Sequence, residues 1–122
     1  MTADPNGAPH AVPVTFVIQD QTLWTAVDAK PKRDMRLRRL ANIVANPAVS
    51  VLVQNWDEDW SQLWWVRADG VATVHDDPAT VTGVAELLRE KYQQYQQVPV
   101  HGPVIEVVVR TWRSWSGAET ST

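Results

Sequence analysis

Residues 46–75 read NPAVSVLVQNWDEDWSQLWWVRADGVATVH, and this stretch carries the clearest secondary-structure signals of the chain. Pro47 ends the element before it, since the residue preceding a proline avoids the helical region. Apolar residues alternate over 48–54, and a longer apolar run covers 63–75, so we expect two strands joined by the polar loop NWDEDWS. Asp69-Gly70 interrupts the second strand, where a bulge or turn would let it bend. The stretch therefore predicts neighbouring strands in a β-rich fold.

The rest of the chain predicts three further strands and two helices. The strands are expected over His10–Ile18, Thr22–Val27 and Val104–Ser116, and the helices over Asp34–Asn46 and from Asp76-Asp77-Pro78, a cap followed by a first-turn proline, to about Tyr95. This order lacks the strand-helix-strand alternation of a parallel sheet. We therefore expect a mainly β, α+β fold: an antiparallel barrel with two helices on its outside.

Length and composition allow one domain, expected over residues 1–116, with a small polar tail at 117–122 that we expect to be disordered. Near the start, Asp4-Pro5-Asn6-Gly7 predicts a tight turn with only a stub of strand before it. The absence of cysteine excludes disulfides and thiolate zinc sites. No segment resembles a signal peptide or a membrane span, so we expect a soluble, cytoplasmic protein without a membrane partner.

A second stretch, Lys30–Arg39 (KPKRDMRLRR), concentrates positive charge. It holds six of the eleven basic residues and one acid, a formal charge of +5 in a chain of −3, so the remainder carries −8. The window lies where the predicted helix begins, and cations there oppose the helix dipole. A bound anion would turn that repulsion into attraction, so we expect a phosphate or polycarboxylate group of a ligand here. A solvated cationic face is the plain alternative.

The same helix divides into two faces at 100° per residue. The polar face carries Arg38, Arg39 and Asn42, which are expected to point away from the core. The apolar face, expected to be buried, consists of Leu37, Leu40, Ala41 and Val44.

Tryptophan is unusually frequent, with seven residues in this short chain, and core packing is the default for most of them. Trp64 and Trp65 are consecutive, so in a strand they point to opposite faces and at least one should lie outside the core. Trp112 and Trp115 also have opposite parity. We expect Trp65 and Trp115 to line a ligand groove, with a dimer interface as the other way to bury an outer tryptophan.

In combination these motifs resemble the pyridoxamine 5′-phosphate oxidase-like split β-barrel superfamily, and within it the deazaflavin (coenzyme F420)-dependent oxidoreductases. The likeness covers nearly the whole chain and depends on PHAVPVTF (9–16), KPKR (30–33), NPAVSVLV (46–53), DEDWSQLWWVRADG (57–70) and WRSWS (112–116). It implies a Greek-key, FMN-binding-like split barrel and a homodimer with the cofactor groove between protomers. It also implies hydride transfer between reduced F420 and a small organic substrate. Family members usually begin with a helix and a complete first strand ahead of ADPNG, and this chain is expected to lack that helix and most of that strand.

The resemblance also implies which residues hold the cofactor. Superfamily members hold the cofactor phosphate with basic residues ahead of an N-P-x-V-S strand, and these positions match Arg38 and Arg39. Asn42, on the same face of the predicted helix, is expected to bind the cofactor with them. Basic residues of the preceding loop suit the phosphodiester and oligoglutamate tail: Lys30, Lys32 and Arg33. Segments that line the ring, largely through backbone contacts, match His10, Val12, Val14, Thr15, Thr25 and Ala26. His10 could also donate to a ring oxygen, although a lone histidine at a strand start is more often hydrogen-bonded locally.

Three alternatives stay open at this point. FMN is the alternative cofactor, and a non-catalytic module that binds F420 is the alternative of a different class. A nucleic-acid binder is the third, which the −8 remainder disfavours. No Ser-His-Asp, paired-carboxylate or HExxH arrangement is visible, so no catalytic side chain is assigned. No metal is expected, because a helix cap explains His75 beside Asp76-Asp77, and a solvated loop explains Asp57-Glu58-Asp59.

Overall fold

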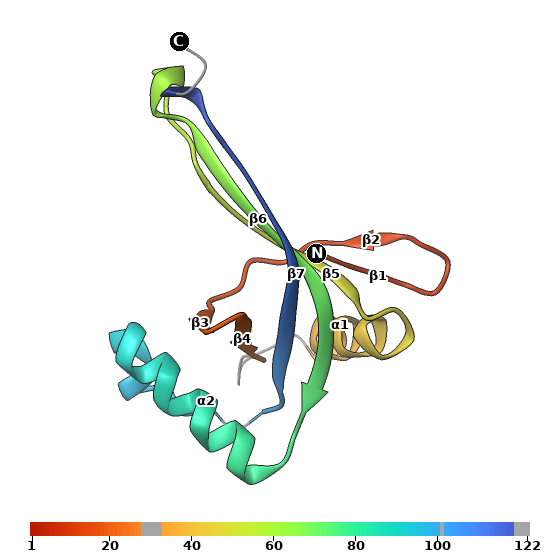
Figure 1. Cartoon of the computed structure of the whole chain (residues 1–122). Helices are drawn as coiled ribbons and strands as arrows, with labels where there is room; N and C mark the ends of the chain where they lie inside the picture. Colours follow the sequence, from red (N-terminus) through yellow and green to blue (C-terminus); the bar gives the residue numbers. More distant parts are fainter. Residues whose placement is uncertain (28–32, 101, 119–122) are drawn as a thin grey trace.

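A computed structural model describes residues 1–27, 33–100 and 102–118, and for residues 33–37 it describes the backbone alone. Its largest element is a five-stranded antiparallel sheet in the order β3-β4-β7-β6-β5 (Figure 1). The strands are β3 (Val17–Gln19), β4 (Thr22–Ala26), β5 (Ala48–Asn55), β6 (Trp64–His75) and β7 (Val104–Ser116). The antiparallel sheet and its two helices confirm the predicted fold class.

The hairpin of β5 and β6 has the architecture that its sequence predicts. Its pairs run from Ala48↔Val71 at the base to Asn55↔Trp64 near the turn. The polar loop between the strands ends in a short 3-10 helix, η1 (Trp60–Gln62). The alternation of valines with other residues therefore predicts strands β5 and β6, and it favours the register in which they pair.

A bulge interrupts the pairing of β6 with β7, where the register shifts between Asp69 and Gly70. This confirms the interruption predicted at Asp69-Gly70. Glycine is needed at the second position because an added Cβ would collide with the backbone carbonyl oxygen of Val108. The sheet can therefore bend here while its strands stay in contact.

A small ribbon of two strands, β1 (Thr2–Ala3) and β2 (Pro9–His10), stands beside the main sheet. The Asp4 carboxylate accepts hydrogen bonds from two backbone N–H groups of the connecting turn, each at 2.9 Å. Gly7 completes the turn with a φ of 84°, a conformation that glycine adopts without steric cost. The predicted tight turn after a strand stub is confirmed.

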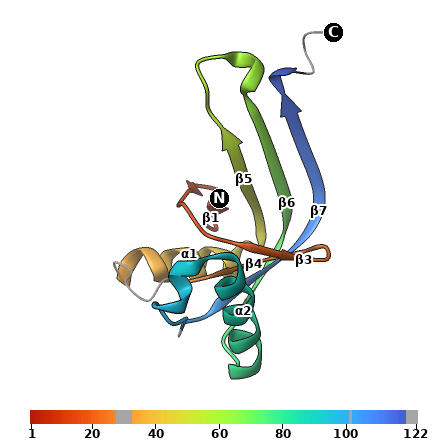
Figure 2. The same ribbon diagram turned by 90° about the vertical axis from the view of Figure 1, so that its left-hand side faces the viewer.

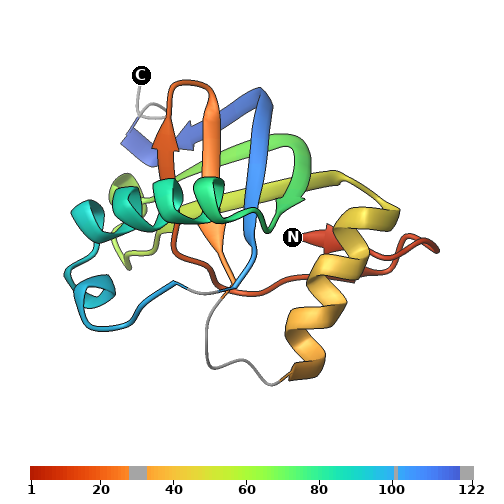
Figure 3. The same ribbon diagram turned by 90° about the horizontal axis from the view of Figure 1, so that it is seen from below.

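Two helices pack against the strands. α2 (Pro78–Lys91) crosses the sheet over β3 and β4, and α1 (Arg33–Ala45) lies on the other side beside β1 (Figure 3). Asp77 caps α2 by accepting the backbone N–H of Thr80 at 3.0 Å, which confirms the predicted cap and first-turn proline. A short 3-10 helix, η2 (Gln93–Gln96), follows α2. In the part of the chain that the structure describes, no helix is long and apolar enough to cross a membrane.

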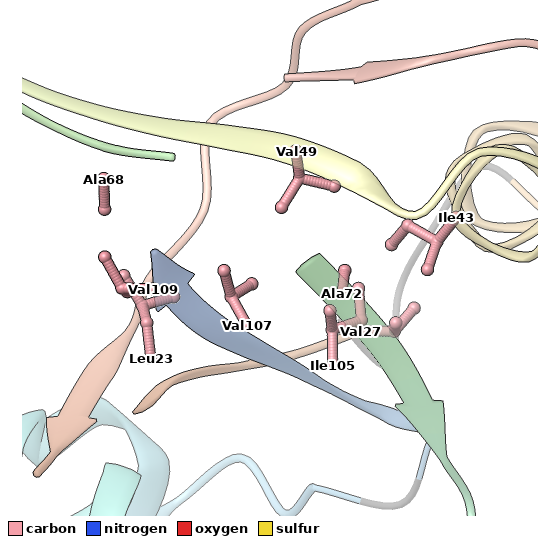
Figure 4. Close-up of a cluster of buried hydrophobic side chains, with 9 residues drawn as sticks. All are labelled: Leu23, Val27, Ile43, Val49, Ala68, Ala72, Ile105, Val107 and Val109. Carbon is pink, nitrogen blue, oxygen red and sulfur yellow. The ribbon is translucent and has the colours of Figure 1, made fainter. Parts of the chain in front are cut away.

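The hydrophobic core forms two clusters. The larger one lies between the sheet and α1 and is drawn in Figure 4; its members are Leu23, Val27, Ile43, Val49, Ala68, Ala72, Ile105, Val107 and Val109. The smaller one lies under α2 and consists of Ala26, Val84, Leu88 and Val104. The sheet thus has apolar packing on both sides, with α1 and α2 serving different clusters.

Beyond the bulge, β5, β6 and β7 extend away from the body as an arm, residues 50–69 and 111–116 (Figures 1 and 2). Exposed tryptophans gather on the arm and its tip: Trp56, Trp60, Trp64, Trp112 and Trp115. Beyond β7 the backbone N–H of Gly117 donates to the carbonyl oxygen of Leu63 at 2.8 Å. Of the predicted tail, residues 119–122 lie outside the described residues.

The strand predicted over His10–Ile18 is wrong for residues 11–16, which belong to no strand. Regular pairing starts only at β3, whose Val17 lies opposite Trp24. Pro13 contributes to this result because it has no N–H to donate to a ladder. The predicted alternation of exposure is nevertheless present: Val12, Val14 and Phe16 are half-buried, whereas the residues between them are exposed.

Candidate functional site

A pocket opens between segment 11–16, α1 and the inner face of the sheet. Its cavity volume is about 270 Å³, just below the range of roughly 300–1,000 Å³ that is common for ligand pockets. The floor is apolar and comes from alternate residues of β5 and β7, Val49, Val51, Ile105 and Val107. The size suits a ring system more than an entire dinucleotide-sized ligand.

Residues 11–16, which belong to no strand, form the wall of the pocket opposite the sheet. Val12, Val14 and Phe16 line the pocket, together with Pro13. Because alternate side chains of an extended chain point to opposite sides, Val12, Val14 and Phe16 share one face of this segment, and that face supplies an apolar wall. The pocket is therefore apolar on two sides.

Polar groups occupy the remaining lining. The Thr25 hydroxyl donates to the Thr15 carbonyl oxygen at 2.7 Å, and the Ser50 hydroxyl donates to the Asp69 carboxylate at 2.6 Å. By contrast, the Nδ1 atom of His10 is buried and has no hydrogen-bond partner among the described residues. A buried polar atom without a partner costs stability, so a ligand that bonds to it gains affinity.

One end of the pocket is positively charged. The Met1 amine, which lines the pocket, donates to the Ser50 carbonyl oxygen at 2.9 Å. Burial lowers the pKa of this amine, and the positive charge of Arg39 lowers it further. Arg39 therefore acts electrostatically on this end of the pocket. Its guanidinium favours an anionic ligand group there.

Arg39 reaches the pocket because the buried face of α1 is rotated from the predicted one. Ile43 and Asn42 are buried, at 3% and 5% exposure, whereas Val44 is 79% exposed. The Asn42 amide donates to the Thr2 hydroxyl at 3.1 Å, and this partner lets a polar side chain be buried. The prediction that Val44 is buried and Asn42 points away from the core is therefore wrong.

The two adjacent arginines separate as a result. Arg38 is exposed to solvent, while Arg39 is half-buried and lines the pocket. They do not form one outward-facing group with Asn42. Lys30 and Lys32 of the cationic window lie outside the described residues, and of Arg33 only the backbone is described, as the first residue of α1.

The structure brings together five of the residues predicted to bind a cofactor, namely His10, Val12, Val14, Thr25 and Arg39. Others lie elsewhere. Thr15 faces the end of α2, with its hydroxyl 2.6 Å from that of Tyr95. Ala26 is buried under α2. Trp65 and Trp115 pair with each other on the arm, outside this pocket.

Several pocket residues were not predicted as site residues. Ser50 and Leu52 come from the strand after α1, and Ile105 and Val107 from the last strand. Val49 and Val51 also line the pocket, and the sequence does hold a signal for them, because they belong to one predicted alternating face. The sequence does not indicate which part of that face remains uncovered and forms a pocket.

Comparisons with known proteins agree on family and fold. The family model described as pyridoxamine 5′-phosphate oxidase matches residues 1–116. A search of curated proteins gives no match. Among solved structures, conserved hypothetical protein Rv2991 from Mycobacterium tuberculosis is 24% identical, with a TM-score of 0.71, over 99% of this chain and 77% of that one.

Two other solved structures show how widely the fold is used. HutZ, the heme storage protein of Vibrio cholerae, is 15% identical with a TM-score of 0.69, over 94% of this chain and 81% of its own. A FAD-binding protein from Mesorhizobium loti is 15% identical with a TM-score of 0.66, over 93% of this chain and 80% of its own. At these identities the likeness concerns the fold alone.

Proposed function

This chain belongs to the pyridoxamine 5′-phosphate oxidase family, and on that premise we propose that it is an oxidoreductase that works with bound deazaflavin F420 on a small organic substrate. The pocket carries the proposal. It combines apolar walls, an unsatisfied imidazole nitrogen and a positively charged end, which are the features that a flat heterocycle with an anionic tail requires.

The residues of the pocket and of α1 suit the two parts of such a cofactor, its ring and its anionic tail. The cavity of about 270 Å³ suits the ring, with Val12, Val14 and Phe16 against one side and His10 Nδ1 available to a polar ring atom. The tail must then continue outside. Arg38 is exposed on the helix that carries Arg39, so tail phosphate or carboxylate groups would meet positive charge both at the pocket and on the surface.

When bound, reduced deazaflavin supplies a hydride for an organic acceptor. The chain itself binds and orients: the apolar walls exclude water, His10 gives the ring a fixed hydrogen bond, and Arg39 holds negative charge at one end. No side chain of the pocket is assigned as a general acid or base. The basic window from 30 to 39 supports F420 over FMN, because the F420 tail carries carboxylates in addition to phosphate.

The arm supports a homodimer as the working form. Trp112 lies opposite Ala68, which is buried in the core, so it shares the face of the sheet that continues the core. Trp64 and Val66 share that face by alternation. Trp64 and Trp112 are nevertheless 40% and 45% exposed, and a second copy would cover them. Trp112→Ser should therefore shift the sedimentation profile towards monomer, and Trp56→Ser at the tip should not.

The first experiment is a side-by-side titration with F420 and FMN, followed by fluorescence polarisation at low salt. F420 should bind more tightly than FMN. The reverse order, or a protein that purifies yellow and releases flavin on heating, would assign FMN instead. Polarisation that stays flat for both ligands would refute the cofactor site.

A second experiment separates an enzyme from a binding module. Reduced F420 is mixed with the protein and an acceptor, such as a quinone or an unsaturated ketone, and the return of the oxidised absorbance is followed. Acceptor-dependent oxidation supports the enzyme. Tight binding with no oxidation across a panel of acceptors would favour a non-catalytic F420-binding module.

A further inference from the structure

Segment 11–16 forms a wall of the pocket, yet it pairs with no strand, and β4 reaches it through a side chain, the Thr25 hydroxyl that donates to the Thr15 carbonyl oxygen. Within residues 1–27, 33–100 and 102–118, no backbone hydrogen bond joins this segment to a neighbouring strand. An extended segment without such bonds has little intrinsic order. Side chains must therefore fix it, and most of those described come from the sequence KYQQY (91–95), which runs from the last residue of α2 into η2.

Tyr92 takes the place of a neighbouring strand at Phe16. Its hydroxyl accepts the Phe16 backbone N–H at 3.3 Å and donates to the Phe16 carbonyl oxygen at 3.0 Å. A strand in an antiparallel ladder supplies the same two functions, one acceptor and one donor, to a paired residue. One phenol group thus satisfies both backbone groups of a pocket-lining residue.

Two neighbours strengthen this attachment. The Lys91 ammonium donates to the same Phe16 carbonyl oxygen at 2.6 Å and lies 4.0 Å from the centre of the Phe16 ring. The Tyr95 hydroxyl lies 2.6 Å from that of Thr15. The rings of Tyr92 and Tyr95 contact each other edge to face, with centroids 6.0 Å apart, and pack on the cluster under α2. The two anchoring tyrosines are themselves held by this packing.

None of these three anchoring residues lines the pocket, whereas Phe16 does. We propose that Tyr92, assisted by Lys91 and Tyr95, is a positioning residue that holds residues 12–16 as a rigid wall of the pocket and so sets its affinity for the cofactor. This proposal rests on the proposed function, because it takes the pocket as the cofactor site. It makes the end of α2 part of the binding machinery without any contact to ligand.

The test compares Tyr92→Phe with the native chain in the absence of ligand. Backbone ¹⁵N relaxation gives order parameters for Val12, Val14 and Phe16. We expect about 0.85 in the native chain and below about 0.6 in the variant, the values of rigid and flexible backbone. Order parameters in β6 should not change. Unchanged values at the three wall residues, or an equal fall in β6, would overturn the proposal.

Affinity provides the second readout, with F420 and FMN as the probes. Tyr92→Phe should weaken binding about tenfold, as expected for two lost hydrogen bonds that position the wall. Gln96→Ala, in the neighbouring helix η2, is the matched control, since its side chain is exposed, and it should change neither readout. A flexible wall with native affinity would refute the positioning role. If the native chain binds neither probe, the proposed function fails, and the relaxation data alone decide whether Tyr92 orders the wall.

Discussion

Replacing Arg39 and Arg38 separately by alanine tests whether the half-buried arginine of the pocket contributes more to cofactor affinity than its exposed neighbour. The two residues are adjacent and chemically identical, but Arg39 is half-buried in the pocket and Arg38 is exposed. A charge-assisted hydrogen bond from a sheltered guanidinium contributes about 1.5–3 kcal/mol, which corresponds to about 10- to 150-fold in affinity. An exposed ion pair contributes roughly 0–1 kcal/mol, or less than about fivefold. Arg39→Ala should therefore weaken F420 binding far more than Arg38→Ala.

The assay is fluorescence polarisation of F420 with each variant at two salt concentrations. The contribution of Arg38 should fade as salt rises, because exposed charges are screened over about 10 Å at 0.1 M ionic strength. The contribution of Arg39 should persist. Arg39→Lys keeps the charge but not the planar fork, so its affinity should lie between those of the native chain and Arg39→Ala.

Thermal unfolding of each variant is the control, because Arg39 is half-buried and its replacement could also change the stability of the fold. Equal losses of affinity in the two alanine variants would rule out a special role for Arg39 in the pocket. So would normal binding by Arg39→Ala with a lower melting temperature, since the residue would then serve the fold alone.

Three further predictions concern stability and use denaturant or pH titrations. Asn42→Ala should lower the free energy of unfolding by about 1–3 kcal/mol, through loss of a buried hydrogen bond, and should leave cofactor affinity unchanged. Gly70→Ala should cost about 1–3 kcal/mol because its Cβ meets backbone, whereas Gly83→Ala on open helix surface should stabilise by up to about 1 kcal/mol. Hydrogen bonds from the Thr80 hydroxyl, and then from the Thr80 N–H, lower the pKa of the Asp77 carboxyl below its ordinary value of 3.8. The stability that this cap contributes should therefore be present above pH 3.8 and be lost as the pH falls through the lowered pKa. The Asp77→Asn variant should lack this dependence on pH.

Most of the sheet could be predicted because alternation and turn chemistry are local signals. The hairpin of β5 and β6, the interruption at Asp69-Gly70 and the cap at Asp77 each depend on residues a few positions apart. Alternation failed over 11–16 for a physical reason. It reports that one side of a segment is buried, and Val12 and Val14 are indeed turned towards the pocket, but it does not report whether a strand lies alongside.

The site was harder to predict because its decisive contacts join distant residues. Asn42 is buried only because Thr2, 40 positions away, accepts its hydrogen bond, and hydropathy alone placed it on the outer face of α1. Phe16 is fixed by Tyr92, 76 positions away. The sequence marks the cationic window, but it does not show that Arg39 faces inward and Arg38 outward.

A crystal structure of the protein saturated with F420 would show whether this pocket is the cofactor site. We expect the deazaflavin ring against Val12, Val14 and Phe16, with a hydrogen bond to His10 Nδ1 and negative charge beside Arg39. Density for the ring on the arm, next to Trp65 and Trp115 and away from His10 of either copy, would contradict it.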